Sequence, residues 1–303
     1  MNKKIFINSG IKIEKGQFNT DFNNQARRTE DGKIFATDVS RKYSIRQNWL
    51  LSGNKVLIRK HELPEGKAKS LVNILNEHDI KKKITSKDFY DKIKDFKDTI
   101  PFGYVIATKD INEKAKGSIQ INMANDINTK YTIEQVLDIT SYKPSGDKDD
   151  NTTIGKKIII EEGYMNWCMV AEPNTYLSLK ETYGIEDKEE VSMKEWTDIT
   201  NDFIETIKDD VTCLNSAIKS GANNLYNLIV YMKDNNTSIN MDLFKKVEVT
   251  NGEIDFINSV NAIIESKVQI DRVELYISDN QKYKNLKTQL ENNKIKLEIK
   301  SLY

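Results

Sequence analysis

The chain has 303 residues, with 46 Lys and Arg against 46 Asp and Glu, so its net charge indicates no partner. Two cysteines, Cys168 and Cys213, exclude a disulfide framework and make a cysteine zinc site improbable. Only two histidines occur, and no nucleophile elbow, phosphate-binding glycine loop or zinc-protease motif is present, which disfavours nucleotide hydrolysis and zinc catalysis. No apolar run reaches membrane-spanning length and the N-terminus lacks a signal peptide, so we expect a cytoplasmic protein without membrane contact.

The N-terminal fifth of the chain predicts a strand, a loop, a helix and a second strand. Alternating isoleucines over residues 3–13 predict the first strand, and the Asn, Gly and Asp content of residues 16–32 predicts a loop. A cap at Thr37 or Asp38 begins a helix that runs to about residue 51, where Ser-Gly-Asn ends it. Residues 55–60 predict a short strand.

The remainder alternates helices and strands. We predict helices at 67–81 and from residue 86, a hairpin of strands 104–108 and 118–124 joined by a charged turn, a long strand at 157–172, a helix over 181–222 and a strand at 225–232. Residues 125–157 are polar, and 145–151 are the least globular segment. The order predicts an α+β domain with a mixed, largely antiparallel sheet, helices against it and one insertion.

Charge is unevenly distributed along the chain. Residues 1–70 hold 15 Lys and Arg against 7 Asp and Glu, whereas residues 181–215 hold 3 against 11. A basic and an acidic face on one molecule would let copies attract head to tail and leave the basic side to a polyanion. Ordinary solvated helices explain the acidic run about equally well.

The loop and first helix concentrate cations. Arg27 and Arg28 end the loop, and Arg41, Lys42 and Arg46 follow on the helix, with Lys42 and Arg46 four residues apart on one face. Such a cationic platform suits a phosphate backbone. On spacing alone, a solvated helix face remains the simpler interpretation.

The residue pattern resembles a known family. The loop N-x-D-x-N-x-x-A-R-R and the helix A-T-D-V-S-x-K-Y-x-I-R-x-x-W resemble the start of the backbone subunit of type I CRISPR Cascade complexes, which includes the DevR-like proteins of the type I-B branch. Residues 102–103, 117–120 and 154–157 resemble, in order, further family segments. Ser118 departs from a usual Pro and Ile158 from a frequent His.

The resemblance implies a fold and partners. The fold would be a modified RNA-recognition-motif-like, ferredoxin-like palm over residues 1–303, with 125–157 as a thumb insertion. Copies would polymerise along CRISPR RNA beside other Cascade subunits and present its spacer to target DNA in antiviral defence. Base pairing would then carry specificity. No catalytic residue, metal or cofactor is expected.

The same resemblance, with the charge pattern, gives the predicted binding residues. Phosphate contacts, register-fixing polar groups and base wedges are the three requirements. The predicted RNA-binding residues are Asn19, Asn24, Arg27, Arg28, Arg41, Lys42, Arg46, Gln120, Lys156 and Lys157. Met123 and Ile154 are the predicted thumb wedges, although core packing explains either one more simply. Replacing Lys42 and Arg46 together by Ala is expected to weaken RNA binding without loss of stability.

Two alternatives remain open from the sequence. Asp21 in the loop could hold a divalent metal and cleave RNA, as a loop aspartate does in backbone subunits of type III complexes. A lone carboxylate is a poor metal site, however, and Asn-x-Asp turns form for structural reasons. The second alternative is a plain interaction protein whose charged faces contact other proteins.

Overall fold

A computed structural model of the chain describes residues 3–59, 61, 67–81, 84–128, 130, 132–140, 154–216, 219–235, 246–279 and 281–303. Its centre is a large sheet in the order β13-β12-β9-β1-β8-β6-β2, and two further strands, β5 and β7, also pair with β8. Among the described strands of this sheet, β12 and β13 alone pair in parallel, while the other pairs are antiparallel. The predicted α+β class with a mixed, largely antiparallel sheet is therefore confirmed.

The sheet strands have these bounds: β1 Ile5–Gly16, β2 Phe35–Ala36, β5 Ile119–Ile121, β6 Ala124–Asp126, β7 Glu134–Thr140, β8 Ile154–Ala171, β9 Ala222–Met232, β12 Ile270–Ile277 and β13 Lys296–Lys300. The long strands β1, β8 and β9 fall where apolar and β-branched residues concentrate in the sequence.

Helices cover both faces of the sheet, so the central strands are buried on both sides. On one face, α8 (Ile257–Glu265) and α9 (Lys284–Asn292) share a core with β9, β12 and β13. On the other, α1 (Asp38–Leu51) and α6 (Glu189–Thr206) pack with β1 and β8. On β1, Ile5 and Ile7 point to the core beneath α1 and α6, and Phe6 points to the core beneath α8 and α9. This is the alternation expected of a central strand.

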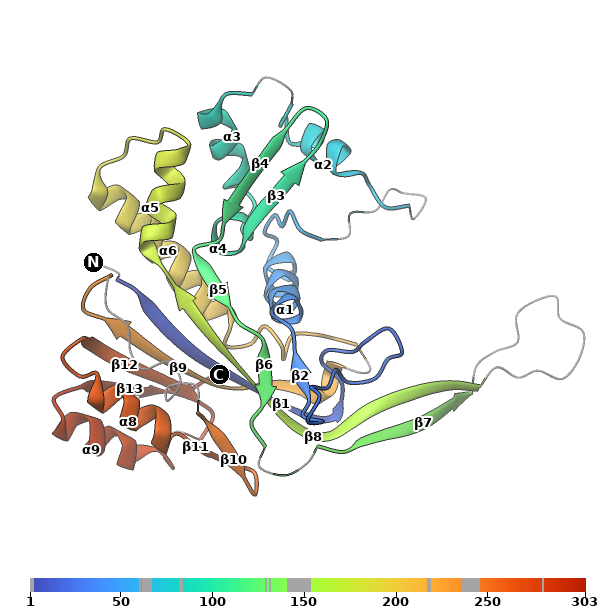
Figure 1. Cartoon of the computed structure of the whole chain (residues 1–303), viewed down its shortest axis with the longest axis vertical. Coiled ribbons are helices and arrows are strands. Elements are labelled where there is room, and N and C mark those ends of the chain that lie inside the picture. Colours follow the sequence, from blue (N-terminus) through green and yellow to red (C-terminus); the bar gives the residue numbers. More distant parts are fainter. Residues whose placement is uncertain are drawn as a thin grey trace, which may run out of the picture.

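A smaller lobe stands beside the sheet (Figure 1). It contains α2 (Leu71–Glu77), α3 (Ser86–Ile93), α4 (Thr99–Phe102), a two-stranded sheet of β3 (Gly103–Ala107) and β4 (Asn112–Lys116), and α5 (Pro173–Thr182). Aromatic contacts hold it together: the ring of Phe89 lies 5.6 Å from that of Tyr183 and 6.0 Å from that of Tyr104.

Three predicted elements were wrong. Strand β3 pairs with β4 rather than with residues 118–124, because the Thr108 hydroxyl accepts the Ile111 amide and closes the turn early. Residues 55–59 form no strand, since the amides of Leu57 and Ile58 donate to the Asp98 carboxylate. The single helix expected over 181–222 is instead the end of α5, then α6, and a short 3-10 turn at Lys219–Gly221.

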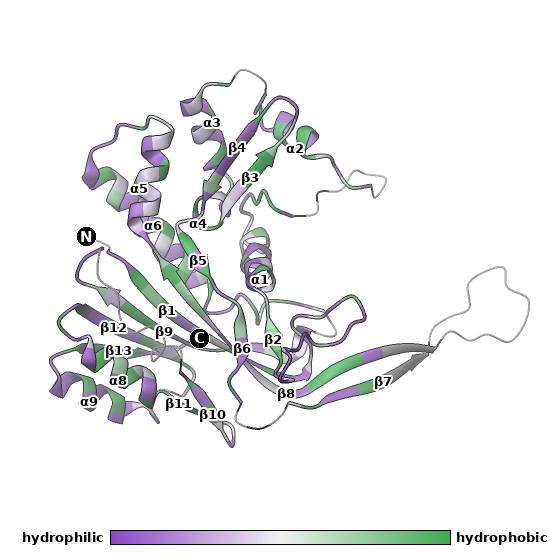
Figure 2. Cartoon of the chain, viewed as in Figure 1, coloured by the Kyte–Doolittle hydropathy of each residue, from purple (hydrophilic) through white to green (hydrophobic). Residues whose placement is uncertain are grey.

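The β7–β8 hairpin projects away from the body of the molecule (Figure 1). We call this hairpin, residues 134–140 and 154–160, the arm. Apolar residues continue along β8 from the sheet into the arm (Figure 2). The predicted insertion at 125–157 thus contains β7 and the start of β8, while the polar segment 145–151 lies outside the described residues.

A second hairpin joins β10 (Glu248–Thr250) and β11 (Glu253–Asp255) through Asn251 and Gly252, both at positive φ, as a tight primed turn requires. Among the described helices, none has the length and apolarity needed to cross a lipid bilayer.

Candidate nucleic-acid interface

The loop before α1, residues 18–34, is held in shape by backbone bridges and side-chain hydrogen bonds. Two isolated bridges, Thr20 to Ala26 and Arg28 to Ile34, fold it into two tight turns. One carboxylate oxygen of Asp21 accepts the amides of Asn23 and Gln25 at 2.8 and 2.9 Å. Asn24 takes a φ of 62°, which Asn tolerates better than most residues. Asp21 therefore caps the first turn, and the exposed Asn24 shapes it.

Arg28 ties this loop to the base of the arm. Its Nε and Nη2 donate to Glu134 at 3.2 and 3.1 Å, and Nη1 and Nη2 also donate to the carbonyls of Gly32 and Thr132. The second Glu134 oxygen accepts the Ala26 amide at 2.7 Å. This paired arrangement occupies most of the guanidinium, so Arg28 holds the loop and the arm in register.

The neighbouring predicted residues have different surroundings. Arg27 is partly exposed, and its buried Nε has no hydrogen-bond partner. The Asn19 side chain accepts the Thr37 amide at 3.0 Å, directly before α1. Thr37 is the helix cap, because its hydroxyl accepts the Ser40 amide. Asn19 thus links the start of the loop to the start of the helix.

Arg41 is wholly buried rather than on the helix surface. Its Nη2 lies 2.9 Å from the Asp210 carboxylate, with both side chains 0% exposed, and it also donates to the Ser9 hydroxyl. Its guanidinium stacks 5.1 Å from the ring centre of Trp167. Burial lowers the pKa of Arg41 and raises that of Asp210, because desolvation penalises both charged forms.

Arg46 is likewise an internal ion-pair partner. Its Nε donates to Asp98 at 2.8 Å, and Arg46 is 7% exposed while Asp98 is fully buried. Lys42 instead keeps a partly exposed side chain, 2.8 Å from Asp38 on the previous turn. The cationic platform predicted from spacing is therefore wrong for Arg41 and Arg46: their charges are neutralised inside the fold, and the charged face of α1 retains Lys42.

A different cation, Lys219, supplements that face, and no sequence pattern pointed to it. The ammonium of Lys219 lies 4.1 Å from the ring centre of Tyr43, which is 45% exposed on α1. Among the described residues its ammonium has no carboxylate partner, and burial lowers its pKa. A half-buried cation on an aromatic ring, lacking an internal anion, favours an external one.

The edge formed by β5 and β6 contributes Gln120 and Met123. Gln120 donates from its amide to the Gly117 carbonyl at 2.6 Å. Met123 is 50% exposed in the connection between the two strands, at an open hollow that Thr29, Asp31 and Phe35 also line. Of the predicted arm residues, Lys157 is half-buried on β8, whereas the side chains of Ile154 and Lys156 lie outside the described set.

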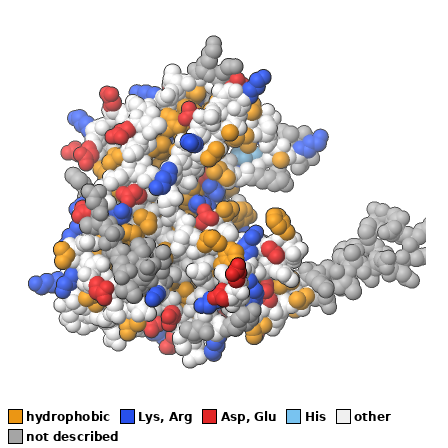
Figure 3. Space-filling model, viewed as in Figure 1, with side chains coloured by type: hydrophobic (Ala, Val, Ile, Leu, Met, Phe, Trp, Pro, Cys, Tyr) orange, Lys and Arg blue, Asp and Glu red, His pale blue; other side chains and the backbone are white. Residues whose placement is uncertain are grey.

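Several acidic side chains of residues 181–215 form ion pairs with lysines of the same chain. Asp202 lies 2.6 Å from Lys97, and Lys180 lies between Asp187 and Glu195, at 2.5 and 2.6 Å. On the face drawn in Figure 3, cationic and anionic side chains are interspersed. No group of three His, Cys, Asp or Glu arranged to hold a metal occurs in the described part of the chain.

The comparisons with known proteins give one family match and several matches in fold. The family model described as "CRISPR-associated protein Cas7" matches residues 3–271. No curated protein matches the chain. A solved chain titled "CRISPR RNA-guided surveillance complex" aligns with a TM-score of 0.55 at 10% identity, covering 92% of this chain and 90% of its own. Another, titled "CRISPR RNA-guided surveillance complex, pre-nicking", gives 0.54 at 11% identity, with 92% and 93% covered. At these identities the likeness concerns the fold.

Proposed function

Because the chain belongs to the Cas7 family of CRISPR-associated proteins, we propose that it is the repeated backbone subunit of a type I Cascade, an RNA-guided surveillance complex. The observation that carries the proposal is the family match, which includes the loop, α1, the arm and the strands of the sheet up to the start of β12. We assign the chain to the type I-B branch on the resemblance of residues 16–49.

The family implies a core like the RNA recognition motif, and the sheet with α8 and α9 on one face supports a ferredoxin-like palm. We propose that residues 1–303 form one unit and that the arm is its thumb. Arg28 and Glu134 support this role, since they fix the base of the arm against the loop that would border the RNA.

The RNA backbone would lie along the exposed face of α1 and the end of the adjoining loop that carries Arg27. Lys42 and Lys219 would neutralise phosphates there, Arg27 would contribute the free part of its guanidinium, and Tyr43 offers an aromatic surface to a base. These contacts carry no base specificity, so pairing between guide and target would select the DNA. Met123, exposed at the neighbouring edge, is the better supported of the two predicted wedges.

Assembly into a filament is supported by apolar side chains on the arm and directly before it. Ile133, Val136 and Leu137 are 56%, 57% and 42% exposed in the single chain. An apolar surface on a projecting hairpin favours a partner that covers it. The partners we propose are CRISPR RNA, further copies of this chain and other Cascade subunits, with target DNA reached through the guide. We expect the complex in the cytoplasm.

A metal-dependent ribonuclease using Asp21 is the second candidate. The carboxylate of Asp21 already accepts two backbone amides of its own turn, which favours a structural role. We therefore propose a subunit without covalent chemistry. Cleavage that requires magnesium or manganese and stops in Asp21→Asn would instead establish the ribonuclease.

The experiment that tests the proposal is purification in gentle salt, with the ratio of absorbance at 260 and 280 nm measured and the bound nucleic acid extracted and sized. RNA of discrete length in oligomers that dissociate after ribonuclease treatment is the expected result. A nucleic-acid-free monomer that also ignores an added synthetic guide would contradict it and favour an interaction protein.

A further inference from the structure

Phe22 is presented to solvent by a rigid turn. Its relative exposure is 101%, the highest among the large hydrophobic residues of the described chain. The turn beneath it is fixed by the Thr20 to Ala26 bridge and by the two amides that Asp21 accepts. We call residues 20–26 the knob. Exposing a Phe in this way opposes the hydrophobic effect, so burial of the ring by a partner would be favourable.

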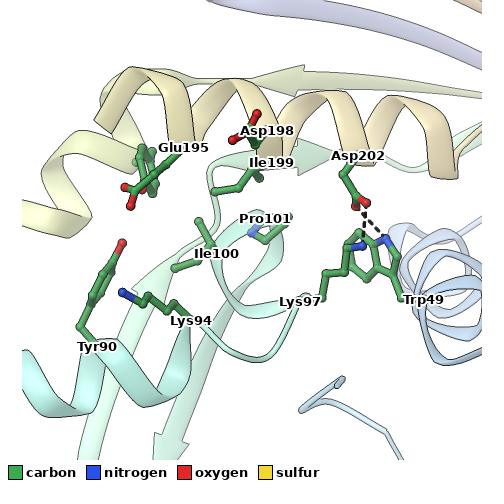
Figure 4. A pocket seen from close by; sticks show the side chains of 11 residues that line it. Trp49, Tyr90, Lys94, Lys97, Ile100, Pro101, Glu195, Asp198, Ile199 and Asp202 are labelled. Carbon is green, nitrogen blue, oxygen red and sulfur yellow. Dashed lines mark hydrogen bonds and ion pairs between the residues drawn. The ribbon is translucent and has the colours of Figure 1, made fainter. Parts of the chain in front are cut away.

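A cavity of matching chemistry lies elsewhere on the same chain, between α3 and α4 on one side and α6 on the other (Figure 4). Its volume is about 380 Å³, enough for a phenyl ring and its flanking backbone. The walls are aromatic and aliphatic, formed by Trp49, Tyr90, Ile100, Pro101, Tyr176 and Ile199. We call this cavity the socket.

Most charges that line the socket are already paired. Asp202 accepts from Lys97 at 2.6 Å and from the Trp49 indole at 3.2 Å. Glu195 accepts from Lys180 and from the Tyr176 hydroxyl, both at 2.6 Å. The socket therefore offers apolar walls with little unpaired charge, which suits an aromatic side chain.

Two exposed charges at the rim give the socket a direction. Lys94, bonded to Asp91, lies near Tyr90, while Asp198 lies farther along α6 beside Ile199 (Figure 4). Asp21 is the knob's single charged residue, and the side chains of its neighbours Asn23 and Asn24 carry amide donors. A knob docked with Asp21 toward Lys94 and the asparagines toward Asp198 would match the rim in charge and in hydrogen bonding.

In Figure 1 the loop that carries the knob lies on the other side of α1 from α3 and α6, the helices that border the socket, so one chain does not fill its own socket. We propose that Phe22 of one copy docks into the socket of the next copy. Because the two surfaces differ, the contact is head to tail and repeats from copy to copy. The proposal rests on the repeated-subunit function above and identifies the contact that propagates it.

The composition of the knob favours a protein partner over RNA. No Lys or Arg occurs between residues 16 and 26, and the knob carries the negative Asp21. Aromatic residues that stack on single-stranded nucleic acid normally work beside a cationic groove. Stacking of Phe22 on a base is accordingly an outcome that the experiment must separate.

The test is thiol crosslinking between copies in a Cys213→Ser background, since Cys168 is buried. Chains carrying Phe22→Cys are mixed with chains carrying Asp198→Cys and treated with a short bis-maleimide, with and without guide RNA. We expect a crosslinked dimer in the mixture, and a ladder when one chain carries both substitutions. The matched control replaces Asp198→Cys by Val268→Cys, which is 77% exposed in the connection between α8 and β12 and should not crosslink.

A second measurement keeps the inference independent of crosslinking geometry. Phe22→Ala should reduce self-association at least tenfold in sedimentation experiments and leave the melting temperature unchanged, because the ring makes no contact within its own chain. Phe22→Trp should retain association. Unchanged association in Phe22→Ala, together with no selective crosslink, overturns the inference.

The failures of the two proposals are distinguishable. RNA-bound oligomers without the crosslink overturn the docking and leave the backbone function. The crosslink in a chain that binds no RNA supports the docking and contradicts the backbone function. Weaker binding of dilute Phe22→Ala to a short single-stranded RNA, without the crosslink, assigns the ring to RNA and overturns the docking.

Discussion

Arg41 and Asp210 lie 2.9 Å apart with neither side chain exposed, and this pair joins α1 to the segment after α6. Asp210 also accepts from the Ser44 hydroxyl and from the Asn224 amide. The guanidinium is less well satisfied, since Nε and Nη1 have no hydrogen-bond partner. Burying the pair costs desolvation free energy, and its contacts fix the position of α1 against the sheet.

Removing one member of this pair should be severe. Asp210→Ala leaves a buried, unpaired guanidinium, and we expect a loss of about 3 to 5 kcal/mol in the free energy of unfolding. Chemical denaturation measures it. A matched control is Asp209→Ala, one residue earlier and without the ion pair, which should cost far less. Equal losses in the two variants would contradict the role of the pair.

Replacing Arg46 and replacing Lys42 by Ala should have different effects on stability, although both residues are cations on α1. Arg46→Ala strands the buried Asp98 and should cost about 3 kcal/mol, whereas Lys42→Ala breaks a half-exposed pair and should change stability by less than about 0.5 kcal/mol. Thermal melts of the single variants test this. The double Ala variant is expected to lose stability, so it cannot report on RNA affinity alone. A stable Arg46→Ala protein would restore the surface interpretation.

Lys219 should carry RNA affinity at the expense of stability. Lys219→Met keeps the packing on Tyr43 but removes a desolvated charge, so we expect the same or slightly higher melting temperature with weaker RNA binding. The slope of log affinity against log salt should fall by about 0.7, the value for one phosphate contact on a single strand. Lys267→Met, in the turn that follows α8, is the control. An unchanged salt slope would remove Lys219 from the interface.

The arm should matter for assembly and little for folding. Val136→Thr with Leu137→Thr keeps strand propensity on β7 and removes exposed apolar surface, so the melting temperature should not fall. Oligomers formed on a guide RNA should become fewer and shorter in light scattering. If the oligomers of the variant keep their length, no partner covers the apolar side chains of the arm in the complex.

Glu298 should remain ionised in acid. Its carboxylate bonds Lys296 and Lys300, and these hydrogen bonds and charges lower its pKa to about 2. A depressed pKa in the folded state means that this interaction stabilises the fold above the ordinary glutamate range and is lost as pH falls toward the lowered value. Carboxyl NMR at about pH 3.5 should show a charged Glu298, while an ordinary glutamate is mostly protonated there.

The control for that measurement is Lys300→Met, which should raise the midpoint of the Glu298 titration. High salt should raise this pKa too, because the Glu298 side chain is 34% exposed and salt screens its attraction to the two lysines. A midpoint in the ordinary range for wild type would mean that the lysines are mobile in solution.

Periodicity and caps predicted the elements whose signal is local. The alternating isoleucines gave β1, the Thr37 cap gave α1 and the apolar run gave β8, each within a few residues. The hairpin after residue 103 was misassigned because the charged residues of β4 resemble a turn in sequence. A two-stranded sheet with exposed side chains accommodates such charged residues.

The candidate site was harder to predict because the partners are distant in sequence. Arg46 and Asp98 are separated by 52 positions, so spacing on α1 could not distinguish a buried ion pair from a surface cation. Lys219 is one of 46 basic residues, and only the packing of its 3-10 turn onto Tyr43 distinguishes it.

Strand β8 is continuous from the middle of the sheet to the arm, and that continuity has a mechanical consequence. Along its inner half it pairs with β1 from Ile5 opposite Ala171 to Gly16 opposite Ile160. Ladder hydrogen bonds lie across the strands, so a pull along β8 loads them together in shear rather than opening them one after another. Tension applied at the arm by a bending nucleoprotein filament would therefore be shared along this whole ladder.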